Sequence, residues 1–339
     1  MCALSLTQKG KVENIPLTST VVENGFCKVR ITHLGFGESD YELVNDKFDN
    51  NNCPRILGRN AVGVITEIAD NSALKKGDRV VICPFIPCLN CIKCHEGNYK
   101  DCVDLAYAGY DTDGFARDFI TLPISSVYTI PERISDEEAV FIPTIAIAYS
   151  IFDKFSNERG KFIGVGDSRL LGTILAKLCL YYQSIPIVFD KRQDFLDKIK
   201  KTGVYYAFEL NDSTSEKVKQ ITSGKLLDYC VYLKKEALPV DEALNFIKNS
   251  GELIVSSTAR VDTARENVSL KHIVDKDIKI IPVPYEQENI MAAINLLASS
   301  AIDVKPLISN KIPVADLADN LMTFNTSEGK PFYMTVVNL

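Results

Sequence analysis

The stretch CLNCIKCHEGNYKDC, residues 88–102, carries the strongest structural signal in this chain. Its cysteines, Cys88, Cys91, Cys94 and Cys102, follow the spacing C-x2-C-x2-C-x7-C. Four thiolates around one ion form the closed tetrahedral site of a structural zinc, which leaves no position open for chemistry. An iron–sulfur cluster and a disulfide pair are the rival interpretations, but the spacing does not follow the ferredoxin patterns. We therefore predict one structural zinc ion per chain.

The remaining composition is that of an ordinary globular protein. The chain has 339 residues, enough for two domains, with 46% apolar and 24% charged residues. Its net charge of −6 offers no basic surface, so nucleic acid and anionic membranes are not expected partners. The N-terminal MCALSLTQKG has no basic segment followed by an apolar core, which predicts no signal peptide. The other six cysteines are scattered, as in a reducing compartment, so we expect a cytoplasmic protein.

Two patterns of hydrophobicity divide the chain near residue 150. Before it, short alternating runs such as 27–35 and 61–69 are punctuated by turn residues, which predicts a β-rich region. After it, apolar runs such as 185–189 alternate with helical stretches such as 168–182 and 192–202. Near-continuous apolar strands that alternate with helices predict a parallel sheet covered on both faces. The fold class expected is therefore α/β, with a β-rich part first.

A glycine turn, GVGDSRLLG, follows the first apolar run of the second region. Gly164, Gly166 and Gly172 approximate the dinucleotide fingerprint G-x-G-x-x-G, with the third glycine late. In a second register, Ser168 replaces one glycine of the fingerprint. A strand that feeds such a turn into a helix points backbone N–H groups at a pyrophosphate. We predict that these four residues bind a dinucleotide, and a plain structural turn is the alternative.

Asp190 ends the next apolar run, 18 residues after Gly172. A carboxylate there accepts hydrogen bonds from the ribose hydroxyls and repels a 2′-phosphate, which favours NAD(H) over NADP(H). A helix N-cap or an ordinary loop residue is the alternative interpretation of Asp190.

Taken together, these motifs resemble the medium-chain dehydrogenase/reductase superfamily, in its zinc alcohol dehydrogenase-like branch. The resemblance covers nearly the whole chain. Its landmarks, in chain order, are ILGRNAVGVITEI, LKKGDRVV, the four-cysteine lobe, GFARDF, the dinucleotide turn and IDVKPLIS.

The resemblance implies a two-domain oxidoreductase. A GroES-like catalytic domain would comprise residues 1–148 and 287–339, with the zinc lobe at 83–103. A Rossmann domain, residues 149–286, would be inserted between these parts. The family also implies hydride transfer between a nicotinamide cofactor and a small alcohol or carbonyl substrate, and assembly as a homodimer or homotetramer.

Departures from the family pattern lie at its catalytic zinc. The family cysteine of G-x-C-G-[ST]-D corresponds to Gly37, and the histidine and glutamate of G-H-E correspond to Arg59 and Asn60. The third ligand falls near Pro143. Glycine and proline side chains cannot ligate a metal, and arginine stays protonated. We therefore predict that the catalytic zinc is lost while the structural zinc is kept.

Arg59 stands where the metal of the family would polarise a substrate oxygen. A guanidinium can donate fixed hydrogen bonds to a developing oxyanion. Asp40 corresponds to the carboxylate that orients the zinc histidine, Ser39 to the family's proton-passing hydroxyl and Glu42 to a relay position. The hypothesis is that Arg59 is the electrophile and Ser39, with Glu42, relays the proton. In the alternative, Arg59 merely neutralises Asp40 and Glu38.

Two other functions stay open at this level. Reduction of a C=C bond conjugated to a carbonyl needs less Lewis acidity than alcohol oxidation, so a zinc-independent enone reductase is one alternative. A non-catalytic scaffold or partner subunit is the other. The run KKEALP, residues 234–239, and the run SSTAR, residues 256–260, place bulk where relatives carry small residues beside the nicotinamide.

Overall fold

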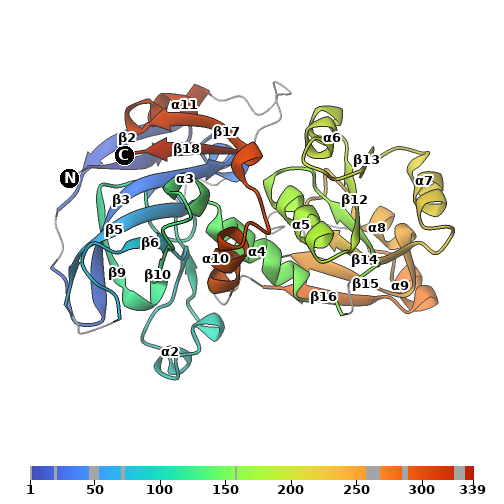
Figure 1. The fold of residues 1–339 in the computed structure, drawn as a ribbon, viewed down its shortest axis with the longest axis horizontal. Coiled ribbons are helices and arrows are strands. Elements are labelled where there is room, and N and C mark those ends of the chain that lie inside the picture. The colour runs from blue at the N-terminus through green and yellow to red at the C-terminus, as the bar shows by residue number, and fades with distance from the viewer. Residues whose placement is uncertain are drawn as a thin grey trace. The chain divides into compact units, whose positions relative to one another are not determined.

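The structure is a computed structural model that describes residues 2–18, 21–45, 53–69, 73–156, 159–256, 268–284, 289–323 and 333–339 (Figure 1). The chain forms two compact units. Unit 1 comprises Met1–Ala146, Glu286–Glu328 and Phe332–Leu339, and unit 2 comprises Ile147–Tyr285 and Gly329–Pro331. The sequence places these boundaries at 148/149 and 286/287.

Unit 1 is built mainly of antiparallel sheets. Its larger sheet runs β10-β6-β5-β3-β18-β17, with β9 also paired to β3, and a smaller sheet runs β2-β1-β4. The strands are β1 (Cys2–Gln8), β2 (Lys11–Pro16), β3 (Phe26–Gly37), β4 (Arg55–Ile56), β5 (Asn60–Ile68), β6 (Arg79–Ile82), β7 (Phe85–Ile86), β8 (Ala106–Tyr107), β9 (Phe119–Pro123), β10 (Val127–Thr129), β17 (Ile308–Pro313) and β18 (Met334–Asn338).

The helices of unit 1 are short and lie between these strands. They are α1 (Glu38–Asn45), α2 (Ile92–His95), α3 (Asp136–Ala139), α4 (Ile142–Phe152), α10 (Ile290–Ala298) and α11 (Leu317–Thr323), with 3-10 turns at Tyr99–Asp101, Ile124–Ser126, Lys305–Leu307 and Val314–Asp316. Helix α4 contains the boundary between the units.

The core of unit 1 lies under β3, which contributes alternate residues to it. Cys27, Val29 and Ile31 are buried and Arg30 is exposed, as the period-2 pattern of a half-buried strand requires. The strand then continues as a run of buried residues from Leu34 to Gly37, and α1 begins directly after it. Residues 38–42 are therefore carried at the end of the longest strand of the sheet.

Unit 2 is a parallel sheet with helices between its strands. The order is β13-β12-β11-β14-β15-β16, which is the doubly wound order 3-2-1-4-5-6. Its elements are β11 (Phe162–Gly166), α5 (Leu170–Tyr181), β12 (Ile185–Asp190), α6 (Gln193–Lys200), β13 (Tyr206–Glu209), α7 (Thr214–Ile221), β14 (Leu227–Tyr232), α8 (Val240–Phe246), β15 (Ile247–Ser256), α9 (Leu270–Lys276) and β16 (Lys279–Val283).

Packing in unit 2 follows from the apolar spacing of the sequence. Helices α5 and α6 contact β11, β12 and β13, and α8 and α9 contact β14 and β15 (Figure 1). The central strands are almost fully buried, as Ile163, Val165 and Val231 show, which explains their continuous apolar character. The predicted parallel sheet is confirmed. Strand order reverses at β11, so the neighbouring ends of β11 and β14 border the crevice where such sheets bind ligands.

None of the helices within the described residues combines the length and apolarity that crossing a bilayer takes.

Candidate active site and metal centre

The cysteines of the predicted zinc site converge in a lobe between β7 and β8. Their Sγ atoms all lie within 4.8 Å of one another, with Cys88–Cys94 at 4.0 Å and Cys91–Cys94 at 3.6 Å. Zn–S bonds of about 2.3 Å put tetrahedral sulfurs about 3.8 Å apart, so the sulfur positions fit zinc. Across the described ranges of the chain, this is the one group of three or more His, Cys, Asp or Glu side chains with such spacing.

The protein environment shifts the pKa values of two of these thiols, Cys91 and Cys94, in opposite directions. Backbone N–H groups of Val103 and Cys94 lower the pKa of Cys91 to about 6. Burial raises the pKa of Cys94 to about 12. A metal ion must displace the proton of the buried thiol, so metal binding releases protons and weakens in acid.

The base of this zinc lobe is the β7–β8 ribbon, which reaches Arg59. Phe85 of β7 pairs with Tyr107 of β8, and their rings stack with centroids 5.0 Å apart. The Arg59 guanidinium carbon lies 5.5 Å from the centroid of the Tyr107 ring, which is cation–π range. Burial raises the pKa of Tyr107, and the positive charge of Arg59 opposes that rise.

Arg59, Asp40 and Ser39 form one hydrogen-bonded cluster. The Nε and Nη2 atoms of Arg59 each lie 2.9 Å from Oδ1 of Asp40, and Nη2 also donates to Ser39 Oγ at 2.5 Å. The backbone N–H of Gly37 donates to the other oxygen, Oδ2, of Asp40 at 2.8 Å. Arg59 and Asp40 are 9% and 3% exposed, whereas Ser39 is exposed. Arg59 and Asp40 therefore form a buried pair with no net charge, in contact with the exposed hydroxyl of Ser39.

Helix α1 presents Ser39, Asp40 and Glu42, and a buried tyrosine fixes its position. The Tyr41 hydroxyl is hydrogen-bonded to Asn320 Oδ1 at 2.7 Å and to Thr335 Oγ1 at 2.8 Å. Glu42 is half-buried and lies three residues after Ser39, which puts both on neighbouring positions of one helical face. The relay from Ser39 to Glu42 stays a prediction.

Two glycines press against the backbone that carries Arg59. A Cβ atom at Gly114 would lie 2.3 Å from the carbonyl oxygen of Gly58 and 2.4 Å from that of Leu57. Gly109, at φ +73°, would place a Cβ 2.9 Å from the Gly58 oxygen and 3.1 Å from Cγ of Arg59. Any side chain at these positions would displace the turn before β5. The GFARDF landmark thus starts with a glycine that the Arg59 turn requires.

The positions that correspond to the family zinc ligands carry no metal-binding side chain. A Cβ at Gly37 would meet its nearest atoms at 3.9 Å, so the space for a side chain exists there. Asn60 donates from Nδ2 to the Gly35 carbonyl oxygen at 3.4 Å. Pro143 is buried near the start of α4.

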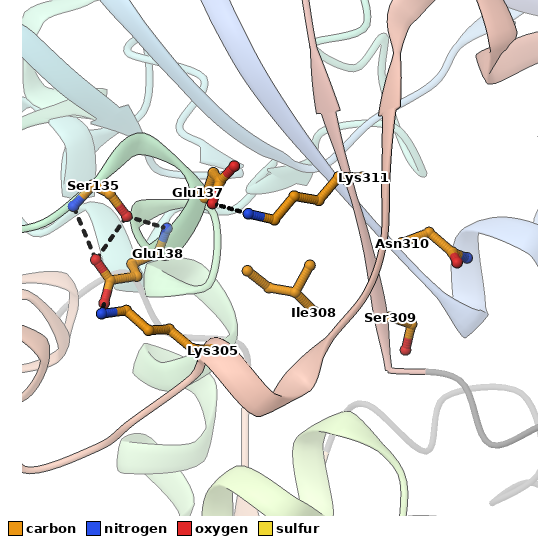
Figure 2. Close-up of a pocket in the computed structure, with 8 residues that line it drawn as sticks. All are labelled: Ser135, Glu137, Glu138, Lys305, Ile308, Ser309, Asn310 and Lys311. Carbon is orange, nitrogen blue, oxygen red and sulfur yellow. Dashed lines mark hydrogen bonds and ion pairs between the residues drawn. The ribbon is translucent and has the colours of Figure 1, made fainter.

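A separate pocket of unit 1, with a volume of about 380 Å³, is lined by polar and charged side chains. Figure 2 shows Lys305 facing Glu138 and Lys311 facing Glu137, with ion pairs of 3.6 Å and 2.5 Å. Glu138 also completes the Ser135 capping box at the start of α3. Because each lysine has a glutamate partner, these pairs join α3 to β17 and to the 3-10 turn before it, and they leave no excess charge for a ligand.

In unit 2, the glycine turn lies between β11 and α5. Ser168 donates to Asp190 Oδ2 from its N–H at 3.2 Å and from its hydroxyl at 2.5 Å. Asp190 is 4% exposed and also accepts from the Arg192 N–H at 3.1 Å. A Cβ at Gly172 would lie 2.1 Å from the Asp167 carbonyl oxygen, so a glycine is needed where α5 meets the turn. The structure thus brings Ser168 and Asp190 into direct contact, and their binding of a dinucleotide stays a prediction.

Comparisons with known proteins give dehydrogenases of the same fold. The family model of the alcohol dehydrogenase GroES-like domain matches residues 23–132. Sorbitol dehydrogenase of Bacillus subtilis strain 168 is 24% identical over 322 residues, which cover 92% of this chain and 90% of that protein. Alcohol dehydrogenase RspB of Escherichia coli CFT073, solved in complex with NADH, has a TM-score of 0.86 at 19% identity, over 100% and 99% of the two chains.

The chain thus carries an alcohol dehydrogenase GroES-like domain and shares the fold of solved dehydrogenases over its whole length, as the resemblance to the medium-chain dehydrogenase/reductase superfamily predicts. A protein of this fold from Sinorhizobium meliloti 1021, solved with NADP bound, has a TM-score of 0.84 at 17% identity, over 100% and 99% of the two chains. The predicted fold class, a GroES-like β-rich part with a Rossmann sheet, is confirmed. The relatives are named as alcohol and polyol dehydrogenases, and together with the four-cysteine cluster they support zinc and a nicotinamide cofactor.

The sequence places Tyr107 among the expected pocket residues, but the contacts that Tyr107 and Asp167 make are not evident from it. Tyr107 lies two residues before Gly109, which packs against the backbone at Gly58 and Arg59. The contact of Tyr107 with Arg59 depends on the pairing of β8 with β7. Asp167 lies inside the glycine turn and accepts hydrogen bonds from both the N–H and Nε of Arg169. The SSTAR segment lies, apart from Ser256, outside the described residues.

Proposed function

We propose that this protein transfers a hydride between a nicotinamide cofactor and an alcohol or carbonyl substrate, without a catalytic zinc. The structural zinc would be held by Cys88, Cys91, Cys94 and Cys102. The observation that carries the proposal is the Arg59–Asp40–Ser39 cluster, because it puts a fixed cation, at a position that corresponds to a family metal ligand, beside an accessible hydroxyl.

The chemistry follows from what each group can donate. Arginine has donors only, so Ser39 Oγ must accept from Arg59, and the serine proton is not used in that bond. That proton can be donated to a substrate oxygen that becomes negative when its carbon receives hydride. Asp40 holds the guanidinium in one orientation, so little reorganisation accompanies the reaction. The bound cofactor supplies or accepts the hydride.

Tyr107 is a second proton donor for the same oxygen. Its hydroxyl interacts with the Arg59 guanidinium, and its raised pKa keeps it protonated at neutral pH. A protonated phenol and the Ser39 hydroxyl would together stabilise an alkoxide, in place of the Lewis acid of the zinc enzymes. We extend the proposed catalytic set of Ser39, Arg59, Asp40 and Glu42 by Tyr107.

For the cofactor, we propose NAD(H) over NADP(H). The support is Asp190, a buried carboxylate at the end of β12 where a 2′-phosphate would meet negative charge. An enone reductase is the second candidate, because hydrogen-bond donors polarise a conjugated carbonyl sufficiently for hydride addition at carbon but acidify an alcohol less than zinc does.

The decisive experiment combines metal stoichiometry with steady-state kinetics. We expect one zinc per chain by elemental analysis. With NADH or NAD and a panel of alcohols, polyols, their carbonyl forms and enones, Arg59→Ala is expected to reduce kcat/KM about 100-fold. Ser39→Ala is expected to reduce it about 10-fold or more. Arg30→Ala, an exposed arginine on β3, is the matched control and should keep the wild-type rate.

Two results would refute the proposal. One is undiminished turnover in both the Arg59 and the Ser39 variants. The other is a second zinc per chain. A chain that binds neither NADH nor NADPH would instead be a scaffold.

A further inference from the structure

A buried carboxylate lies in the turn that the proposed function assigns to the cofactor. Asp167 is 5% exposed and directly follows Gly166, the last residue of β11. Its Oδ1 accepts from Arg169 Nε at 2.8 Å and from the Arg169 N–H at 3.2 Å. Burial raises the pKa of Asp167, but the cations Arg169 and Lys234 more than offset this, so its pKa is lowered and it stays ionised. The turn therefore contains its own anion.

Lys234 approaches the same place from the neighbouring strand. Gly166 of β11 pairs with Tyr232 of β14, so the residues that follow each strand leave the sheet side by side. A tight turn then brings the chain back, because the Leu238 N–H donates to the Lys234 carbonyl oxygen at 3.1 Å. A Cβ at Gly166 would lie 2.8 Å from Cβ of Leu238, which shows that this turn packs directly on the end of β11.

The backbone of the turn is less available to a phosphate than in the usual fingerprint. Ser168 takes a glycine position, and its N–H is bonded to Asp190. The next N–H, that of Arg169, is bonded to Asp167. Two of the donors that such a turn normally offers to a pyrophosphate thus contact carboxylates of the chain itself. Binding of a dianionic pyrophosphate here needs positive side chains in addition.

The strand order places these side chains where a dinucleotide crosses the sheet. The order β12-β11-β14 makes the gap between the ends of β11 and β14 the topological switch point. Arg169 stands at the first of these ends, at the N-terminus of the 12-residue helix α5, and Lys234 follows the second. Together with Asp167, these side chains carry a net charge of about +1 at neutral pH.

We infer that Arg169 and Lys234 form a two-cation clamp for the cofactor pyrophosphate, with Asp167 as the internal anion that occupies the clamp until the cofactor binds. This inference rests on the proposed function and adds its phosphate-binding residues. It also assigns a role to the KKEALP run: Lys234 contributes a cation and Leu238 fixes the turn on Gly166, rather than crowding the site.

Binding of NADH to the full chain tests the clamp without any need for a substrate. The chain has no tryptophan, so the fluorescence of NADH itself and isothermal titration calorimetry are the signals. Arg169→Ala and Lys234→Ala are each expected to raise the Kd for NADH about tenfold, as loss of a charge-assisted phosphate contact does. Lys235→Ala removes the same charge from the adjacent, exposed position and should leave the Kd within about twofold.

Asp167→Asn separates the internal anion from a merely structural residue. If the carboxylate competes with the pyrophosphate, this variant binds NADH about threefold more tightly or better, and its Kd rises more steeply with added salt. Thermal melts without cofactor show whether each variant folds, and the NADH-induced rise in Tm gives a second measure of binding.

The outcomes are distinguishable. Unchanged Kd values in both Arg169→Ala and Lys234→Ala, with wild-type binding intact, overturn the clamp and leave the proposed function standing. Weaker NADH binding by a folded Asp167→Asn variant overturns the competing-anion role. If the wild-type chain binds no NADH or NADPH, the proposed function and the clamp fall together.

Discussion

Two polar clusters of unit 1, the zinc lobe and the Arg59–Asp40 pair, solve the same electrostatic problem in opposite ways. In the zinc lobe, four sulfurs lie within 4.8 Å and become mutually repulsive as they ionise, so the cluster needs a cation from outside. At Arg59 the cation is part of the chain and is bonded to Asp40 at 2.9 Å. The first cluster is expected to depend on metal supply and acid, whereas the second is complete once the chain folds.

The largest expected effect comes from breaking the zinc lobe. Cys94→Ser removes a buried ligand and should reduce bound zinc from about one ion per chain to near zero. Loss of a structural zinc costs several kcal/mol, so we expect the Tm to fall by about 10 °C and proteolysis within residues 88–102 to increase. Cys2→Ser, an exposed cysteine outside the cluster, is the control. Full zinc content in the Cys94 variant would contradict the four-sulfur site.

A smaller but specific effect is expected at the built-in cation. Arg59→Ala leaves the 3% exposed Asp40 without its partner, which should cost about 3–5 kcal/mol of unfolding free energy in urea titrations. Removing both charges in Arg59→Ala/Asp40→Asn should recover more than half of that loss, because no buried charge is then unpaired. Zinc content should be unchanged in both variants. Equal stability of the single and double variants would show that the pair does not behave as a buried ion pair.

The smallest effect is expected at a second Arg–Asp pair, Arg79–Asp136, which lies outside the proposed active site and can be compared with Arg59–Asp40. Contacts with His33 and Arg79 lower the pKa of Asp136 from 3.8 to about 2. Because this pKa is lowered on folding, the contribution is present above pH 4 and is lost as the pH falls toward 2. Asp136→Asn should therefore cost about 2 kcal/mol at pH 7 and almost nothing near pH 2. Asp212→Asn, at an exposed position, should show no such pH dependence of the difference.

The sequence predicts those parts of the molecule whose determinants are local. The two-residue gaps between the first three cysteines keep their thiols close together, so the spacing alone predicts the cluster. The apolar runs after residue 150 form the parallel sheet. The resemblance to the family suggests that Asp40 and Arg59 pair, and the structure shows this contact; the hydrogen bond from Arg59 to Ser39 is an additional finding of the structure.

What the sequence misses depends on contacts between distant strands. Tyr107 joins the Arg59 cluster only because β8 pairs with β7, two-residue strands that are too short to give a periodic signal. Asp167 occupies a position that the G-x-G-x-x-G pattern leaves open, and its proposed role depends on Lys234, 67 residues later. The contact of Ser168 with Asp190 likewise requires the register of β11 against β12.

The β7–β8 ribbon links the two clusters compared above, since the same two strands frame the cysteine loop and hold the aromatic ring beside Arg59. The supply of zinc during synthesis is therefore expected to affect the Arg59 cluster as well as the cysteine loop. In a chain produced without zinc, we expect the β7–β8 ribbon to be less ordered. The Tyr107 ring would then no longer be held against the Arg59 guanidinium. The structural zinc, although it does not contact a substrate, would in this way set the fraction of catalytically active molecules in a preparation.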